Sequence, residues 1–335
     1  MHRSLLHQTI LILGVTGLAV ALAASVPAQD RTGWPPTVRI GTASAGGTYH
    51  VYGGGLAALI RSELEVDALP EATGGPLHNL MLIQEGLAQI GMATMGPAED
   101  SWHGKSPAAP GIAMRNVRAA FPMYQTPFQI VALEASGIRS LADLAGKRVG
   151  VGPMGGTCAT YWPPFFEALG VGDVRVQYGN ANELGRFVGM RLIDAFAFCA
   201  GLPIPVFLEL EQRHAVTFFA LDAQQSATLV ERFPVSVYEI AAGTYASQRE
   251  AQHSVAMWNF AIVHKDLPDS FVHELIKLAL DDNDRMRRIH AAARETLAEN
   301  WKHNSVIWFH PGAIRYYEEQ GFAIPEELWP PEASG

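Results

Sequence analysis

Short apolar runs alternate with amphipathic segments along most of the chain. Val38 to Thr42 is a β-rich run that leads through a Gly-rich loop into a helix expected over 49–63. A strand and turn over 65–75 then precede a helix over 77–85, and the apolar run 88–95 is typical of a buried strand. Strands that alternate with helices of this length predict parallel βαβ units and an α/β fold.

The same order returns in the second half, where a strand over 147–151 again feeds a Gly-rich loop. The other elements expected beyond residue 127 are strands over 128–133, 174–178, 193–198 and 256–263, and helices over 141–144, 159–169, 181–190, 270–283, 284–301 and 311–320. Residues 109–127 have a mixed pattern that predicts no element. Ligands of open α/β sheets bind beyond the carboxyl ends of strands, so two such halves predict a cleft between two lobes.

The N-terminus predicts an exported protein. Arg3 precedes an apolar run over 9–24, and Val26 and Ala28 occupy the −3 and −1 positions of a small-residue cleavage site. We therefore expect residues 1–28 to be a signal peptide cleaved after Ala28, and the mature chain to be periplasmic. A second cleavage site ends at Ala23, and an uncleaved anchor is the alternative, although the run is slightly short for a span.

Composition removes several function classes. The 335 residues carry 24 Lys and Arg against 33 Asp and Glu, a net charge of −9, with no basic run, which argues against nucleic-acid binding. A hydrophobic share of 48% is enough for a large core. Two cysteines exclude a disulfide scaffold or an all-Cys metal site, and the 12 histidines lack metal-binding spacings. We expect neither a metal nor a cofactor.

Five segments together resemble the TAXI-type solute-binding subunits of TRAP transporters. They are IGTASAGGTYHVYGGGLA (40–57), EATGGPLHNLMLIQEGLAQIGM (71–92), SGIRSLADLAGKRVGVGPMGGT (136–157), RLIDAFAFCAGLP (191–203) and FHPGAIRYYEEQG (309–321). The chain departs from the family pattern at His50, at Pro76, which replaces a usual Ser, and in the 155–158 loop.

The resemblance implies a two-lobe periplasmic-binding-protein fold of type 2-like form. The strands expected over 128–133 and 256–263 should cross between the lobes, so we expect lobe 1 to consist of 29–128 plus 256–335 and lobe 2 of 129–255. It implies a monomeric, non-enzymatic receptor that closes around a small carboxylate, such as a glutamate-like amino acid or an oxo acid. The receptor would deliver this ligand to a small and a large TRAP membrane subunit, separate or fused. A ligand-sensing module for a membrane signalling protein is the alternative.

The candidate ligand site consists of loops that precede helices. Free N–H groups and the helix dipole at such loops favour a carboxylate, although Thr48 and Thr73 could instead cap their helices. The expected ligand-binding residues are Thr42, Ser44, Gly46, Gly47, Thr48, Tyr49, Thr73, Gly74, Gly75, Thr94, Gly155, Gly156, Thr157, Cys199 and Pro203.

The two cysteines allow two interpretations. Cys199 follows a strand that should end near the loop of Cys158, so a Cys158–Cys199 disulfide is expected in an exported protein. The alternative is a hydrolase or transferase that uses Cys158 as nucleophile, but no partner base is identifiable by spacing. Tyr124, Trp162 and the pair Phe196 and Phe198 could line the cleft or belong to the core.

Overall fold

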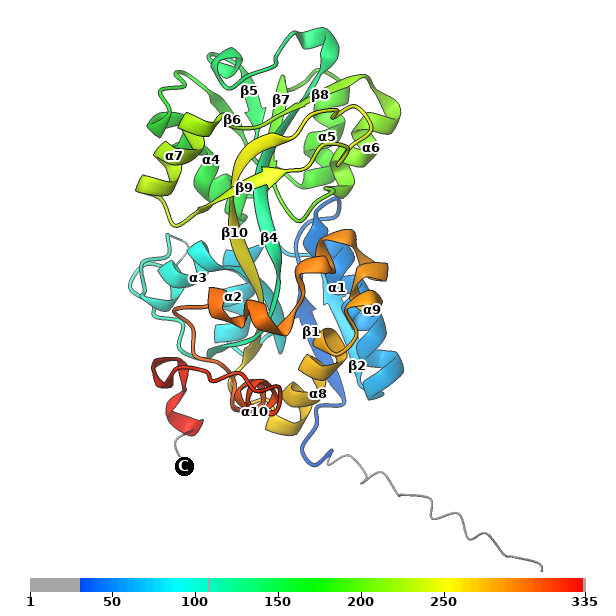
Figure 1. Ribbon diagram of the computed structural model, residues 1–335, viewed down its shortest axis with the longest axis vertical. Coiled ribbons are helices and arrows are strands. Elements are labelled where there is room, and N and C mark those ends of the chain that lie inside the picture. The colour runs from blue at the N-terminus through cyan, green and yellow to red at the C-terminus, as the bar shows by residue number, and fades with distance from the viewer. Residues whose placement is uncertain (1–30, 108, 334–335) are drawn as a thin grey trace, which may run out of the picture. The chain divides into compact units, whose positions relative to one another are not determined.

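The computed structural model describes residues 31–107 and 109–333, whose strands form one mixed ten-stranded sheet (Figure 1). The order along the main path is β2-β1-β3-β10-β4-β7-β5-β6, with β8 beside β4 and β9 beside β10. The strands are β1 (Thr37–Gly41), β2 (Asp67–Glu71), β3 (Ile90–Thr94), β4 (Val117–Leu133), β5 (Arg148–Gly150), β6 (Arg175–Gln177), β7 (Ala195–Cys199), β8 (Val216–Phe219), β9 (Ser236–Ile240) and β10 (Gln252–His264). Strands β1 and β2, and likewise β5 and β6, pair in parallel across a helix, as the alternating pattern predicts.

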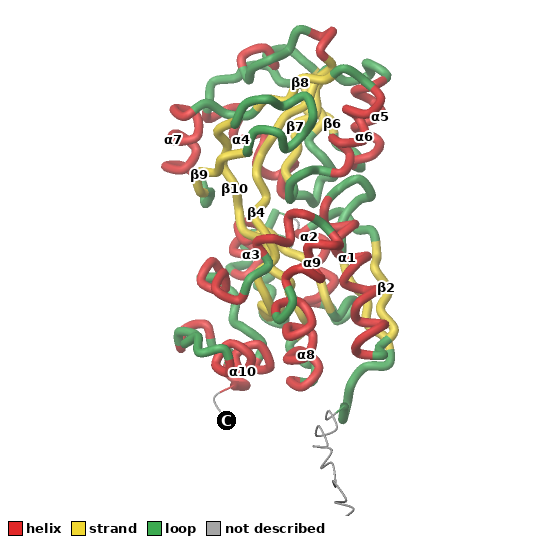
Figure 2. The backbone as a smooth tube through the Cα atoms, turned by 45° about the vertical axis from the view of Figure 1, so that its right-hand side comes forward, coloured by secondary structure: helices red, strands yellow, loops and turns green. Residues whose placement is uncertain are grey.

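Strands β4 and β10 run from one lobe into the other, as Figures 1 and 2 show. They have 17 and 13 residues and pair antiparallel. The sequence predicted only their parts over 128–133 and 256–263, and the interpretation of 109–127 as lacking an element was wrong from Val117 onward. Proline cannot donate to the ladder, so a strand that runs through Pro122 is unusual. The ladder shifts register between Trp258 and Phe260, opposite this proline, and such irregularities tolerate proline.

The helices predicted for both halves are present. Most of their ends lie within one or two residues of the predicted positions. The helices are α1 (Thr48–Leu59), α2 (Pro76–Gln84), α3 (Met95–Trp102), α4 (Thr157–Ala168), α5 (Ala181–Gly189), α6 (Pro205–Arg213), α7 (Ala223–Arg232), α8 (Asp269–Leu280), α9 (Asn283–Ile289) and α10 (Pro311–Glu319). A π-helical turn, Ile60–Leu64, continues α1, and the predicted 141–144 helix is a 3-10 turn, Ala142–Leu144. Elements α3, α6, α7, β8 and β9 were not predicted. Within the described ranges, no helix has the length and apolar character needed to cross a bilayer.

The single helix predicted over 284–301 is wrong. Helix α9 ends at Ile289, His290 is extended, and two 3-10 turns, Ala291–Glu295 and Ala298–His303, follow. The ring of His290 explains the break, because its Nδ1 accepts the Ala292 N–H and its Nε2 lies 3.1 Å from the Pro203 carbonyl oxygen. The first bond satisfies a local N–H that a continuous helix would otherwise pair, and the second ties the ring to a carbonyl far away in sequence.

Buried apolar side chains form two clusters, one in each lobe. The cluster of lobe 1 draws on residues 38–124 and 260–328, and that of lobe 2 on residues 128–257. The chain thus passes between the clusters along β4 and β10. The predicted lobe limits, 29–128 plus 256–335 and 129–255, remain a prediction, and the predicted signal peptide lies outside the described residues.

Candidate functional site

A small cavity lies between the two lobes, beyond the carboxyl ends of β1, β3 and β7. Its volume is about 50 Å³. Both lobes contribute to its wall, which consists of Ala43, Ser44, Gly47, Thr48, Tyr49, Gly75, Pro76, Thr94, Thr126, Pro153, Gly156, Thr157, Cys158, Phe198, Cys199 and Ala200. This is the position that open α/β sheets offer to a ligand.

Four helices begin at this cavity. Their N-cap residues, Gly47 of α1, Gly75 of α2, Thr94 of α3 and Gly156 of α4, all line it. In these four described helices, no N-cap side chain accepts a first-turn N–H and no acidic residue stands in the first turn. Helix α7, in contrast, begins with a capping box formed by Asp222. Four positive dipole ends and the first-turn N–H groups of α1, α3 and α4 therefore meet at one volume, which favours an anion there. In α2, Pro76 has no N–H and the Leu77 N–H donates to Gly155 O, so this helix contributes mainly its dipole.

The cavity wall itself is uncharged. Among the described residues that line it, none is Asp, Glu, Lys, Arg or His. The described chain also contains no group of three or more His, Cys, Asp or Glu side chains that could hold a metal ion. An anion in this cavity would therefore be bound by backbone amides and hydroxyl groups rather than by an arginine side chain.

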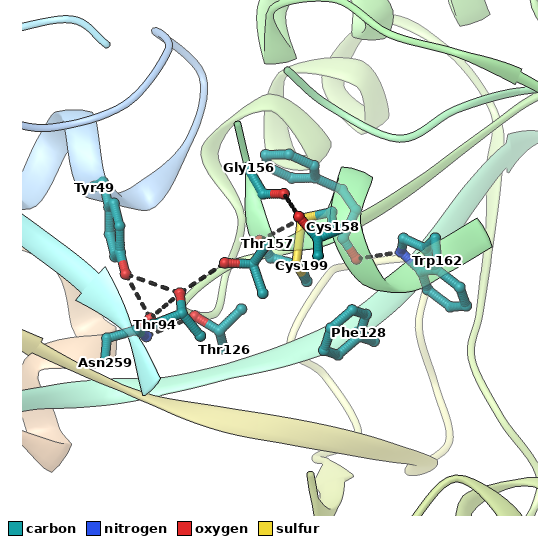
Figure 3. Close-up of a disulfide and its surroundings, with 12 residues drawn as sticks. Tyr49, Thr94, Thr126, Phe128, Gly156, Thr157, Cys158, Trp162, Cys199 and Asn259 are labelled. Carbon is teal, nitrogen blue, oxygen red and sulfur yellow. Dashed lines mark hydrogen bonds between the residues drawn. A yellow bond between two sulfur atoms is a disulfide. The ribbon is translucent and has the colours of Figure 1, made fainter. Parts of the chain in front are cut away.

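A network of hydroxyl groups and one amide forms the polar wall of the cavity (Figure 3). Asn259, which is fully buried, accepts hydrogen bonds from Tyr49 at 2.6 Å and Thr94 at 2.9 Å, and donates to the Thr126 hydroxyl at 2.6 Å. The Thr157 hydroxyl reaches Thr94 at 2.7 Å. Burial raises the pKa of the Tyr49 phenol, so Tyr49 stays protonated at any physiological pH and can donate.

Hydrogen bonds across the interface hold the lobes together. Most involve backbone groups of the loops around the cavity, so the bonds depend on loop geometry rather than on long side chains. They join Thr48 Oγ1 to Gly201 O (2.6 Å), Val206 N to Gly46 O (3.0 Å), Leu77 N to Gly155 O (3.2 Å), Asn182 N to Ala45 O (3.2 Å), Ala181 N to Ser44 Oγ (3.2 Å) and Thr157 Oγ1 to Thr94 Oγ1 (2.7 Å). The lobes are therefore in a closed arrangement.

The expected disulfide between Cys158 and Cys199 is present in the structure (Figure 3). It joins the first turn of α4 to the last residue of β7, with 5.4 Å between the two Cα atoms. Both cysteines line the cavity, so the bond fixes part of its lobe 2 wall. A sulfur held in a disulfide is not a thiolate, and the nucleophile interpretation of Cys158 therefore has no support here.

Nine of the fifteen predicted ligand-binding residues line the cavity, namely Ser44, Gly47, Thr48, Tyr49, Gly75, Thr94, Gly156, Thr157 and Cys199. The other six, Thr42, Gly46, Thr73, Gly74, Gly155 and Pro203, are outside its wall. Thr42 and Thr73 tie backbone segments together, since they donate to Glu71 O at 2.7 Å and to Thr42 O at 3.0 Å. Thr48 does not cap α1, because its hydroxyl donates to Gly201 O in lobe 2.

Sequence reasoning did not place the lining residues Ala43, Pro76, Thr126, Pro153, Cys158, Phe198 and Ala200 in the ligand set. Pro76 had a signal, since it replaces the usual Ser of the resembled family. Thr126 had none, because it belongs to the segment for which no element was predicted. Phe198 lines the cavity, whereas Tyr124, Trp162 and Phe196 are core residues.

Solved structures with the same two-lobe α/β arrangement include three bacterial examples. One is a structure from a study of glutathione import via GshT and the cystine ABC importer TcyBC of Streptococcus mutans. It has 14% sequence identity and a TM-score of 0.51, and the match covers 81% of this chain and 100% of that chain. A periplasmic transporter has 12% identity and a TM-score of 0.50, covering 78% and 87%. The GluR0 ligand-binding core of Nostoc punctiforme with L-glutamate has 15% identity and a TM-score of 0.47, covering 76% and 97%.

Likenesses at these identities concern the fold alone, which is that of two-lobe periplasmic binding proteins. The sequence itself matches a defined family over most of its length. The profile of the NMT1-like family aligns with residues 40–321, which include both Gly-rich loops, both long strands and the His310 cap of α10. The chain belongs to the NMT1-like family.

Proposed function

We propose that this protein is an extracytoplasmic solute-binding receptor that captures a small carboxylate by closing its two lobes. The observation that carries this proposal is the meeting of four helix N-termini, without side-chain caps, at an uncharged cavity between the lobes. Backbone N–H groups in such a site bind a carboxylate without any counter-charge. The two-lobe fold and the NMT1-like family membership agree with ligand capture rather than catalysis.

The size of the cavity favours short acids. An engineered protein cavity of about 150 Å³ holds benzene, which has six heavy atoms. The cavity here, at about 50 Å³, is a third of that size. We therefore infer that short mono- or oxo-carboxylates fit the closed lobes, and that an acid as long as glutamate would require a wider separation.

The proposed membrane partners are a small and a large TRAP subunit, separate or fused, to which the receptor would deliver its ligand from the periplasm. The five sequence segments that resemble the TAXI type support this assignment. A sensory module is the second candidate, since the same capture mechanism can report to a membrane kinase. Neighbouring genes distinguish the two, because a transporter requires multi-span subunits and a sensor requires a kinase or regulator.

A thermal-shift panel tests the ligand class. The mature chain, unfolded and refolded to release copurified molecules, is melted with acetate, pyruvate, 2-oxobutyrate, glutamate and 2-oxoglutarate, and with the neutral amides acetamide and pyruvamide. A carboxylate at a hundred times its Kd adds about 2.7 kcal/mol to the free energy of unfolding. We expect a shift with at least one short carboxylate and none with its amide. The proposal fails if no carboxylate raises the melting temperature or if the amides act equally.

A further inference from the structure

The orientation of the buried Asn259 amide can be derived from its neighbours. Its Nδ2 lies 2.7 Å from the Tyr124 carbonyl oxygen and 2.6 Å from Thr126 Oγ1, while its Oδ1 faces Tyr49 and Thr94. A backbone carbonyl oxygen can only accept, so the nitrogen must stand on the Tyr124 side. The Nδ2 group therefore donates to Tyr124 and Thr126, and the oxygen must accept from the other two.

This orientation decides where three hydroxyl hydrogens go. Because Asn259 Oδ1 carries no hydrogen, Tyr49 and Thr94 both donate to it. Thr94 then has no hydrogen left for Thr157, which lies 2.7 Å away, so Thr157 must donate to Thr94. Tyr49, Thr94 and Thr157 have each used their single hydroxyl hydrogen inside the network.

Thr126 is the exception in this network. Its Oγ1 accepts from Asn259 and keeps its own hydrogen, for which no described residue offers an acceptor. The residue lies on β4 (Figure 3). It lines the cavity and is only 3% exposed. Leaving a buried donor unpaired costs about 1–3 kcal/mol, so a hydrogen bond from Thr126 to a ligand oxygen would be favoured by a similar free energy.

We propose that Thr126 is a ligand-binding residue that donates its hydroxyl hydrogen to a carboxylate oxygen, and that Asn259 is the residue that positions it. This inference rests on the proposed function, because it names a contact of the same site. Helix N-termini supply donors from both lobes, and Thr126 adds a donor from the strand that joins the lobes. Thr157 of lobe 2 contacts Thr94 of lobe 1, so residues of both lobes complete the network beside the ligand position.

The experiment compares Thr126→Val, which keeps the shape and removes the hydroxyl, with Thr126→Ser, which keeps the hydroxyl. The matched control is Thr160→Val, since the Thr160 hydroxyl donates to Gly156 O within α4 and does not line the cavity. Affinities for acetate, pyruvate, 2-oxobutyrate, glutamate and 2-oxoglutarate are measured by calorimetry after urea unfolding confirms that each variant folds. For the carboxylates that the parent binds, we expect Thr126→Val to raise the Kd about ten- to a hundredfold, the worth of a charge-assisted hydrogen bond. Thr126→Ser and Thr160→Val should stay within about threefold.

A double-mutant cycle tests the positioning role. In Asn259→Asp the carboxylate cannot donate, so the Thr126 hydroxyl turns toward it and its hydrogen is no longer free for the ligand. Thr126→Val should then cause no further loss in the Asn259→Asp background, which a merely structural Asn259 would not produce. If that variant does not fold, the comparison of Thr126→Val with Thr126→Ser still decides.

The outcomes separate the two proposals. A parent protein that binds none of the five carboxylates overturns the proposed function and, with it, the role of Thr126. A parent that binds while Thr126→Val keeps its affinity overturns this inference alone. Equal losses for the Val and Ser variants also contradict it, because they would indicate a packing effect rather than a hydrogen bond.

Discussion

Removing the Cys158–Cys199 disulfide should destabilise the protein without unfolding it at room temperature. The bond spans a sequence separation of 41 residues. In the chain-entropy description, closing a loop of this length stabilises the folded state by about 4 kcal/mol relative to the reduced chain. Reduction also releases the first turn of α4 from the end of β7. Because both cysteines line the cavity, this change loosens part of its wall.

The loss can be converted into a change of melting temperature. Unfolding entropy is about 2.1 cal/mol/K per residue, or about 0.6 kcal/mol/K for the roughly 300 residues of the unit that begins at Thr32. A loss of about 4 kcal/mol then lowers the melting temperature by about 6 °C. Circular-dichroism melts with and without a phosphine reductant measure this shift, and thiol labelling in denaturant counts free cysteines.

The control is the Cys158→Ala/Cys199→Ala double variant. Its melting temperature should be close to that of the reduced parent and should not change when the reductant is added. Two reactive thiols in the denatured but unreduced parent would mean that the disulfide does not form. A shift of less than about 1 °C, once labelling has verified complete reduction, would refute the loop-entropy reasoning.

Three further perturbations follow from buried contacts. Glu332→Ala should cost about 2 kcal/mol in urea unfolding, because it leaves the guanidinium of Arg118, only 2% exposed, without its carboxylate. Burial, and next the charge of Arg118, lower the pKa of His310 to about 4 from 6.5, so the folded state binds fewer protons than the unfolded state between these values. Stability should therefore fall by about 2 kcal/mol from pH 7 to pH 5, and His310→Asn, which keeps a capping acceptor, should remove this part of the pH dependence. Gly46→Ala puts a side chain on a residue with φ of +92° and a methyl 3.0 Å from the Asn182 backbone nitrogen of the other lobe, so it should open the lobes, seen as a larger radius of gyration in X-ray scattering.

Two of these predictions have a control variant nearby in the chain, and each has a result that would contradict it. Glu327→Ala, on the exposed side of the same C-terminal segment, should leave the urea midpoint unchanged, and an equal loss there would contradict the role of Glu332. An unchanged pH profile in His310→Asn would show that other groups carry the acid sensitivity. Gly54→Ala adds a methyl that meets nothing within 4 Å, so an equal expansion in this variant would contradict the contact at Gly46.

Short-range patterns were sufficient for much of the fold. The Gly-rich loop before α1 could be predicted because glycines and small residues at the end of a strand mark a turn into a helix. The start of α10 was equally readable, since His310 before Pro311 is a local cap and its ring accepts the Gly312 N–H. The disulfide could also be predicted, because β5 and β7 end at the same edge of the sheet. Cys158 lies in the helix that follows β5, and Cys199 is the last residue of β7.

The break of α9 at His290 and the length of β4 were not readable, because partners far away in sequence decide both. His290 needs the Pro203 carbonyl, and β4 continues through Pro122 only because β10 shifts its register beside it. Helix and strand propensities depend only on residues that are close in sequence, whereas the bounds of these two elements depend on residues that are close in space.

The sequence by itself determined the α/β class and the two Gly-rich loops, since these are recorded in local patterns. The tertiary structure decided that four uncapped helix ends meet at one uncharged cavity, and that Asn259 donates a hydrogen bond to the Thr126 hydroxyl in its wall. These two residues lie 133 positions apart, and only the pairing of β4 with β10 brings them together. A hydrogen bond depends on distance and direction in space, and no spacing along the chain records either.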